Sequence, residues 1–431
     1  MIRSLHFRNF KSFYDAEIKL EPLTIVIGSN ASGKSNALDG LRILSESSTG
    51  TDLAVVLDGY RGKESSGVRG GSKSCPRFGS DTFTLGATVD SGEEGRSLYY
   101  ELSVTVGDRI YVQAESLSEI VQTRRGNSQK RMLYQTVSDN QSPGDITVEY
   151  NNQKRGPNPQ FQCLKFQSVL SQVASRLPKK TAAETRIHEM ADKVMEQLQS
   201  VLFLDPIPHE MRDYVPHTSV ELSPSAWNMS AALDKLMQED PAHKVRVVNF
   251  LRQLPDQEIT DVGVVRTPLG DVMLRVQERA GRDTYWIDAR GLSDGTLRSL
   301  AIVTALLSEQ PGSLVVIEEV DNGVHPSRAR AILSLLGELC GERDIHLLVT
   351  THNPALLNAV TGEEAVGVVV CYRDRTEGDS RFVPLVNLDA YFRIAAHERI
   401  GDAMESGEIT RAVLGEDTQV NREALEWLRS L

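Results

Sequence analysis

The sequence lacks several features that mark particular classes of protein. Its 431 residues include only four cysteines (Cys75, Cys163, Cys340 and Cys371), at separations of 88, 177 and 31 residues. No CxxC pair occurs, so the spacing predicts neither a zinc site nor a disulfide framework and favours a reducing, cytoplasmic compartment. No run approaches the roughly 20 apolar residues of a membrane-spanning helix. The first seven residues alternate like a strand and do not form a secretory signal.

A strong excess of charge of one sign is absent as well. The 47 basic and 59 acidic side chains give a net charge of −12, which argues against a histone-like polycation but permits a local basic groove. A chain of this length, with 40% hydrophobic residues, is expected to form about two or three packed units. We find no internal repeat and no heptad run long enough for a coiled-coil arm.

The first part of the chain predicts strands and one helix. Residues 1–27 read as two strands followed by the continuous apolar run 23–27, which is typical of a buried parallel strand. A helix is expected over 34–44. Residues 61–80 hold five Gly, five Ser and five Arg or Lys but one acid, and predict a mobile loop. Alternation over 82–149 predicts antiparallel hairpins.

The rest of the chain changes pattern twice. Residues 166–253 predict helices, with prolines interrupting them and a stripe formed by Val194, Leu198, Val201 and Leu202. After residue 262 strands return, and helices at 296–308, 327–339 and 354–360 alternate with strands at 314–317 and 346–350. We therefore expect an N-terminal lobe at 1–165, a helical insertion at 166–260 and a C-terminal lobe at 261–431.

The most specific motif is the run Gly28-Ser29-Asn30-Ala31-Ser32-Gly33-Lys34-Ser35. It fits G-x-x-x-x-G-K-[ST] and stands between a predicted buried strand and a helix, where backbone N–H groups can surround phosphates. Lys34 can reach the β- and γ-phosphates, and the Ser35 hydroxyl can bind Mg²⁺. The alternative is a chance match in an ordinary glycine turn.

A second motif is the strand 314–317 followed by Glu318 and Glu319. Mg²⁺ prefers oxygen ligands, so Glu318 can hold the ion directly or through water, and Glu319 can polarise an attacking water. Paired acids at a strand end are also common on surfaces. The phosphate loop is what makes the catalytic interpretation strong.

Two further motifs are weaker on their own. Residues 291–296, Gly-Leu-Ser-Asp-Gly-Thr, open a helix and offer N–H donors and a hydroxyl, but taken alone they favour a helix start capped by Ser293 or Asp294. In the run 349–354, Val-Thr-Thr-His-Asn-Pro, a strand ends at His352 and a proline opens a helix. A lone histidine is usually structural, yet its place after a second parallel strand leaves a functional role open.

In this order, the four motifs resemble the ABC-type ATPase heads of the RecF, SMC, Rad50 and OLD-like families. The resemblance is strongest to small bacterial AAA-family ATPases (AAA15/AAA21 type) found beside effector genes in anti-phage defence systems. Residues 5–13 look like their first strand and nucleotide-flanking turn, and 318–326 look like their Walker B motif and D-loop. The specific resemblance covers 1–50 and about 285–360.

The resemblance implies an α/β fold: an ABC-type ATPase head (a P-loop NTPase) with an antiparallel β subdomain and a helical insertion. Two heads would enclose two ATP molecules with Mg²⁺, Glu319 and His352 acting at the γ-phosphate and Ser293 serving the other subunit's nucleotide. Further nucleotide contacts are expected at Gly28, Asn30, Ser32, Gly33, Lys34, Ser35, Asn36 and Gly295. Mg²⁺ would be held by Ser35, Glu318 and the Q-loop residue Gln172, with Gln167 as its rival.

The resemblance also implies a role and leaves alternatives open. Glu318 replaces the usual Asp and Val320 a frequent Pro, but neither change removes a needed group. OLD nucleases carry a C-terminal Toprim domain; the 79 residues after His352 contain no Asp-x-Asp, so a separate nuclease or toxin is the expected effector. By this resemblance, the homodimer, or a larger oligomer of dimers, would control that effector in defence against phage.

The alternatives are a RecF-like DNA-repair clamp and a scaffold that holds ATP permanently. Direct contact with DNA or RNA would use basic residues of a predicted hairpin and of the 61–80 loop, which are also compatible with a solvated tip: Arg124, Arg125, Lys130 and Arg131, then Arg61, Lys63, Arg69, Lys73 and Arg77. We expect residues 61–260 to form a lid and docking surface.

Overall fold

The structure, a computed structural model, describes residues 1–60, 67–122, 128–137, 144–253, 258–321, 329–360, 362, 364–389, 391, 394 and 399–415. The chain forms two compact units. Unit 1 comprises residues 1–20, 29–201 and 371–383, and unit 2 comprises residues 21–28, 202–370 and 384–431. Among the described residues, no helix has both the length and the apolar character to cross a membrane.

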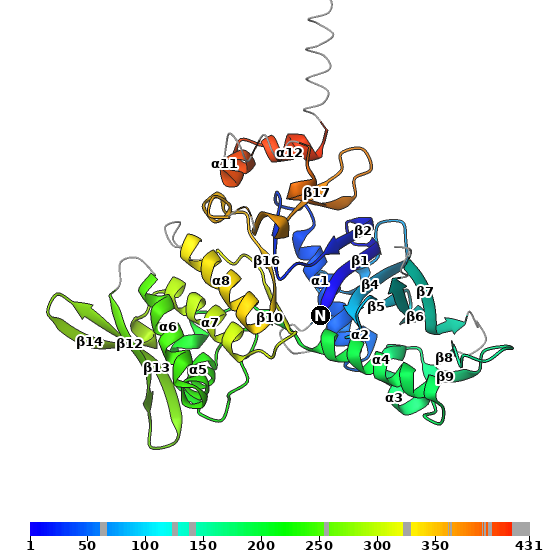
Figure 1. The fold of residues 1–431 in the computed structure, drawn as a ribbon, viewed down its shortest axis with the longest axis horizontal. Helices are drawn as coiled ribbons and strands as arrows, with labels where there is room; N and C mark the ends of the chain where they lie inside the picture. The colour runs from blue at the N-terminus through cyan, green and yellow to red at the C-terminus, as the bar shows by residue number, and fades with distance from the viewer. Residues whose placement is uncertain are drawn as a thin grey trace, which may run out of the picture. The chain divides into compact units, whose positions relative to one another are not determined.

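Unit 1 is built on an eight-stranded sheet in the order β2-β1-β4-β5-β6-β7-β8-β9 (Figure 1). Neighbouring strands of this sheet run antiparallel, which confirms the expected hairpins. The strands are β1 (Ile2–Phe10), β2 (Phe13–Lys19), β4 (Thr82–Asp90), β5 (Arg96–Val106), β6 (Ile110–Gln122), β7 (Ser128–Val137), β8 (Asp145–Tyr150) and β9 (Gln160–Leu164).

Four helices cover the apolar face of this sheet: α1 (Lys34–Ser48), α2 (Leu53–Asp58), α3 (Val169–Arg176) and α4 (Ala182–Gln199). Alternation along β1 sends Leu5 and Phe7 into the core, where the Phe7 and Phe13 rings stack with centroids 4.9 Å apart. Helix α1 runs to Ser48, four residues beyond the expected end.

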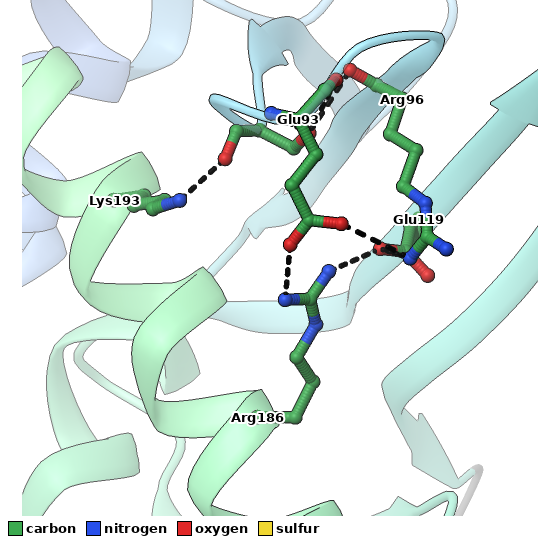
Figure 2. A network of polar contacts seen from close by, with 6 residues as sticks. Glu93, Arg96, Glu119, Arg186 and Lys193 are labelled. Atoms are coloured by element: carbon green, nitrogen blue, oxygen red, sulfur yellow. Dashed lines mark hydrogen bonds and ion pairs between the residues drawn. The ribbon is translucent and has the colours of Figure 1, made fainter.

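An ion network fastens α4 to the sheet, as Figure 2 shows. Arg186 of α4 binds Glu93 in the β4–β5 turn at 2.5 Å and Glu119 of β6 at 2.7 Å. Arg96 shares both carboxylates, at 3.2 Å each. The Glu119 side chain is only 4% exposed, so its charge depends on these two guanidinium groups. Lys193 of α4 also donates to the Ser91 carbonyl.

A buried carboxylate holds the start of α3. Glu115 of β6 accepts the backbone N–H groups of Val169 and Leu170, each at 2.6 Å, and the Tyr134 hydroxyl donates to it at 3.2 Å. Burial raises the pKa of Glu115 to about 7, although these hydrogen bonds favour the ionised form. The sheet and the helix are thus joined through a group that titrates near neutral pH.

The segment expected to be a mobile loop is fixed in its described part, which corrects that expectation for residues 67–80. Val68 and Cys75 are buried, and Ser72–Ser74 forms a short 3₁₀ turn. Arg69 pairs with the buried Asp39 of α1 at 3.1 Å, and Lys11 binds the same carboxylate at 2.6 Å. Because the segment neutralises a buried charge of α1, its glycine-rich composition does not make it a free loop. Arg61 and Lys63 lie outside the described residues.

Unit 2 holds the parallel sheet that the alternating pattern predicted. Its strands are β10 (Val201–Leu204), β15 (Leu314–Ile317), β16 (His346–Thr350), β3 (Leu23–Ile27) and β17 (Val368–Arg373), in that order, followed by β18 (Ser380–Pro384). Every residue of β15, β16 and β3 is buried, as a parallel strand between layers requires. Beyond Val370, β17 and most of β18 belong to unit 1.

Unit 2 also contains helices α7 (Asp294–Ser308), α8 (Ala329–Arg343), α9 (Pro354–Leu357), α11 (Ile400–Glu405) and α12 (Glu408–Val413). Of these, α8 contacts β16 and β3, α7 and α9 contact α8, and α11 contacts α9 and α12. The second sheet has β11 (Val215–Pro216), β12 (Ile259–Arg266), β13 (Asp271–Ala280) and β14 (Asp283–Asp288), against which α5 (Met229–Glu239) and α6 (Pro241–Gln253) pack (Figure 1).

The segment expected at 166–260 as one helical insertion is divided in the structure: α3 and α4 belong to unit 1, whereas α5 and α6 belong to unit 2. The expected helical stripe is shorter than the sequence pattern predicted. Val194 and Leu198 lie buried on α4, but Val201 and Leu202 belong to strand β10, so the expected helical stripe ends at Gln199. Helix α9 is also shorter than the expected 354–360.

Candidate functional site

The phosphate-loop motif forms a tight turn between β3 and α1. Gly28 and Gly33 have φ angles of 152° and 118°, and Ala31 is also left-handed at 63°. A Cβ added to Gly33 would lie 2.7 Å from Ser380 Oγ and 3.0 Å from Ser12 Oγ. Only glycine meets both the backbone angle and this close approach, so the second glycine of the motif is required by geometry.

The start of α1 has the features of an anion site. Gly33 stands at the N-cap, so the N-cap residue offers no side chain to accept the first N–H groups of the helix. Asn30 is exposed, whereas Ser32 is buried and its hydroxyl has no hydrogen-bond partner in the described part of the chain. Lys34 Nζ lies over the loop, 3.0 Å from the Ser29 carbonyl oxygen. These groups fit the phosphates of a nucleotide.

Two other residues of this turn have protein partners. The carbonyl of Ser35 accepts from Arg69 at 2.9 Å, which holds the first turn of α1 and leaves the Ser35 side chain half-buried. The Asn36 amide donates to Ser12 Oγ at 2.8 Å, so it ties α1 to the β1–β2 turn. The expected nucleotide contact of Asn36 stays a prediction.

In unit 2, the structure brings together the two strand ends singled out from the sequence. Glu319 follows β15 and His352 follows the neighbouring strand β16, and His352 Nδ1 lies 3.9 Å from Glu319 Oε1. The two side chains are 46% and 51% exposed, and thus accessible. Glu319 has a left-handed backbone, with φ 50°, and its N–H donates to Thr350 Oγ1 at 2.9 Å. That bond holds a strained residue in place.

Two threonines that sequence reasoning did not assign hold this edge together. Besides Thr350, Thr351 is buried and donates to Asp321 Oδ1 at 2.5 Å. The signal was available in the sequence, since hydroxyl residues at the end of β16 stand opposite the acids that follow β15. Glu318 is half-buried beside them. Residues 322–328, which include the rest of the expected D-loop, lie outside the described residues.

The signature-like turn forms a capped helix start, as the motif taken alone indicated. Ser293 is the N-cap of α7: its Oγ accepts the Thr296 N–H at 3.2 Å and lies 2.8 Å from Thr296 Oγ1. Ser293 is nevertheless exposed, while Gly295 is buried in the first turn. Capping uses a lone pair of the hydroxyl, so this geometry is compatible with a contact to an incoming phosphate.

The side chain of Gln172, the predicted Q-loop residue, is used in hydrogen bonds within the protein. It is buried in α3, its Oε1 accepts the Leu164 N–H at 2.8 Å, and its amide nitrogen donates to the Leu164 carbonyl at 2.9 Å. Its remaining amide contacts are the carbonyls of Gln167 and Ser168. These bonds give Gln172 a structural role in joining α3 to β9. Its predicted binding of Mg²⁺ has no support in this geometry.

The described residues contain no group of three or more His, Cys, Asp or Glu side chains that could hold a metal ion. A divalent cation held by this protein would therefore need further ligands, such as the phosphates of a nucleotide. Mg²⁺ commonly binds in this way, with few protein ligands. The Ser35 hydroxyl and the Glu318 carboxylate are each oxygen donors of the kind that Mg²⁺ prefers.

Two family models match the chain. Residues 1–82, which hold the phosphate loop, match the model described as "AAA ATPase domain". Residues 202–358, which hold the signature-like turn, Glu319 and His352, match the model described as "AAA domain, putative AbiEii toxin, Type IV TA system". No curated protein matches the chain.

Solved structures of SMC heads are loosely similar. One, an SMC head bound to the C-winged helix domain of ScpA, is 14% identical with a TM-score of 0.45 over 89% of this chain and 96% of that chain. The SMC head domain from Thermotoga maritima is 14% identical with a TM-score of 0.39 over 89% and 98%. An SMC head with an extended coiled coil, bound to the C-terminal domain of ScpA and derived from Pyrococcus furiosus, is 13% identical with a TM-score of 0.44 over 89% and 95%.

Proposed function

We propose that this chain, an AAA-type ATPase of the RecF/SMC-like group, binds ATP with Mg²⁺ and hydrolyses it. The observation that carries the proposal is the placement of accessible Glu319 and His352 at adjacent strand ends, 3.9 Å apart, in a chain whose helix α1 begins directly after the glycine turn of the phosphate-loop motif. A carboxylate beside an imidazole can accept a proton from water and orient it toward a phosphate.

Each residue has a role in this proposal. Lys34 and the N–H groups of the loop bind the β- and γ-phosphates, and Ser35 with Glu318 holds the cation, which when bound neutralises phosphate charge. Glu319 accepts the proton of the attacking water. His352 donates to the γ-phosphate and keeps the Glu319 carboxylate oriented.

We extend the proposal to a dimer. In the families that the sequence resembles, two heads enclose nucleotide, so Ser293 and Gly295 of one copy would meet the phosphate held by Lys34 of the other. Nucleotide binding would close the dimer and hydrolysis would open it, and the two states would signal to a separate nuclease or toxin in phage defence. The putative toxin model matched by residues 202–358 supports this context.

The alternative of direct nucleic-acid binding has less support. Arg124 and Arg125 lie outside the described residues. Of the remaining cations, Arg69 is bound to Asp39, and Lys130 lies over the Tyr99 ring at 4.4 Å from its centroid. Cations already engaged in this way offer less charge to a phosphate backbone.

Nucleotide titration calorimetry and phosphate release test the proposal. Lys34→Ala should abolish tight ATP binding, because it removes the cation of the loop, whereas Glu319→Gln should keep binding and stop turnover. Exposed Lys73→Ala and Glu221→Gln are the matched controls and should behave like the parent. Normal hydrolysis by the Lys34 variant would show that the site is assigned wrongly.

A further inference from the structure

One guanidinium group binds the whole turn that leads to Ser293. Arg212, in the 3₁₀ turn Glu210–Arg212, lies 77 to 82 residues earlier in the chain than its partners. Its Nη1 donates to the carbonyl oxygens of Ala289 at 3.1 Å, Arg290 at 2.8 Å and Leu292 at 2.8 Å. Its Nη2 donates to Asp294 Oδ1 at 2.5 Å. Its side chain is 25% exposed, so these bonds are partly shielded from water.

The turn has local anchors as well: Asp288 Oδ1 accepts the Arg290 N–H at 3.0 Å, and Ala289 and Leu292 are buried. Arg290, Gly291, Ser293 and Asp294 are nevertheless exposed, and the turn's internal bond from the Leu292 N–H to the Ala289 carbonyl is long, at 3.4 Å. Exposed backbone changes conformation more readily than buried backbone. The four acceptors bound by Arg212 add a constraint from a separate segment of the chain.

The constraint determines where donors of the turn point. A trans peptide is planar, with its C=O and N–H on opposite sides. Because the Leu292 carbonyl is directed at Arg212, the N–H of Ser293 must point away from it. The same argument applies to the Arg290 carbonyl and the Gly291 N–H. Arg212 therefore fixes two backbone donors of the turn, the N–H groups of Gly291 and Ser293, in directions away from its own guanidinium group.

Arg212 also compensates the negative charge of the Asp294 carboxylate. Asp294 stands next to Ser293, and its side chain is 67% exposed. A free carboxylate there would repel an approaching phosphate, because both groups carry negative charge. The ion pair with Arg212 holds the Asp294 carboxylate against the guanidinium group, whose positive charge balances that of the carboxylate.

We propose that Arg212 is a positioning residue that holds the turn 289–294 and the Asp294 carboxylate so that Ser293 can meet a phosphate of the nucleotide bound by a second copy of the chain. The inference rests on the proposed function, since it needs Ser293 to serve a composite site. Nothing in the sequence signals it, because Arg212 lies in an irregular segment far from the motif.

Steady-state hydrolysis and binding of a fluorescent ATP analogue test the inference with Arg212→Met, Arg212→Lys and the hairpin-tip control Arg282→Met. The Met variant keeps an apolar stem and should lose at least tenfold in kcat, with analogue affinity within about threefold of the parent, because the phosphate loop is untouched. The Lys variant should be intermediate, because an ammonium cannot match a planar, forked donor set. The control should equal the parent.

Complementation separates positioning from general damage. Arg212→Met supplies an intact phosphate loop, and Lys34→Ala supplies an intact turn, so mixing the two inactive variants should restore up to about a quarter of parental activity through mixed dimers. Arg212→Met mixed with Ser293→Arg should restore none, because both lack the turn.

Two outcomes overturn the inference. One is a folded Arg212→Met variant with the kcat of the parent, together with an inactive Ser293→Arg variant. That result would show that the composite site needs Ser293 but does not need Arg212. The other is loss of folding in both Arg212 variants, measured by circular dichroism, which makes the residue purely structural. Parental activity in Ser293→Arg would instead remove the composite site, and with it the proposed dimer mechanism.

Discussion

Replacing Glu115 by glutamine should remove a pH dependence of folding that is built into unit 1. The carboxylate is fully buried against the first turn of α3, where it accepts two N–H groups. Burial raises its pKa from an ordinary 4.5 to about 7. The folded protein therefore holds this proton up to near neutral pH, whereas the unfolded chain releases it above about pH 4.5.

The sign and size of the effect follow from this difference. A raised pKa contributes stability that is fully present below the unfolded pKa and is lost as the pH rises through the folded pKa. The shift of about two and a half units corresponds to roughly 3 kcal/mol of unfolding free energy. Most of the loss should occur between about pH 5 and pH 7, and the loss should be complete near pH 8.

Urea unfolding followed by far-ultraviolet circular dichroism, at constant ionic strength and pH 5 to 8, measures the effect. The unfolding free energy of the parent minus that of Glu115→Gln should fall by roughly 2 to 3 kcal/mol across this range, because part of the effect is lost below pH 5. The same difference for Glu94→Gln, at an exposed turn position, should stay flat. A constant difference between the parent and Glu115→Gln would refute the reasoning, because the buried carboxylate would then not be titrating in this range.

Three further substitutions test other contacts. Gly33→Ala should weaken ATP binding by tenfold or more in a calorimetric titration, because φ is 118° and the new Cβ would lie 2.7 Å from Ser380 Oγ. Arg186→Met should lower the unfolding free energy by about 3 kcal/mol, and adding Glu119→Gln should recover part of that loss, because the buried charge is then gone. Gly367→Ala places a Cβ against a backbone carbonyl of β3, so its melting temperature should fall by about 10 °C or more.

Local patterns were sufficient for the parts of the fold in which neighbouring residues decide the structure. The apolar run 23–27 and the glycines after it predict β3 and the turn into α1, and alternation predicts the hairpins β4 to β8. The adjacency of Glu319 and His352 could also be predicted, because parallel strands end at the same edge of a sheet.

Long-range partners account for what the sequence could not predict. The composition of residues 67–80 indicates a loop, yet Asp39, some 30 residues away, fixes it through Arg69. Gln172 stands near a plausible position for a Q-loop, but the backbone of β9 takes up its amide. Arg212 meets its turn only through the fold of unit 2. In each case a polar side chain binds a partner that is set by the fold and cannot be identified from the neighbouring sequence.

The division of the chain limits how this protein can be dissected. The polypeptide passes between the two units after residues 20, 28, 201, 370 and 383, so no single cut releases either unit. A fragment ending at residue 201 would carry β3 without its partners β16 and β17, and would expose a strand whose every residue is buried in the whole protein. Insertions face no such barrier at hairpin tips such as Gly281, where an added Cβ would meet no described atom within 4 Å. Insertions at the hairpin tips are therefore expected to be tolerated, whereas a truncation that removes one unit also disrupts the other.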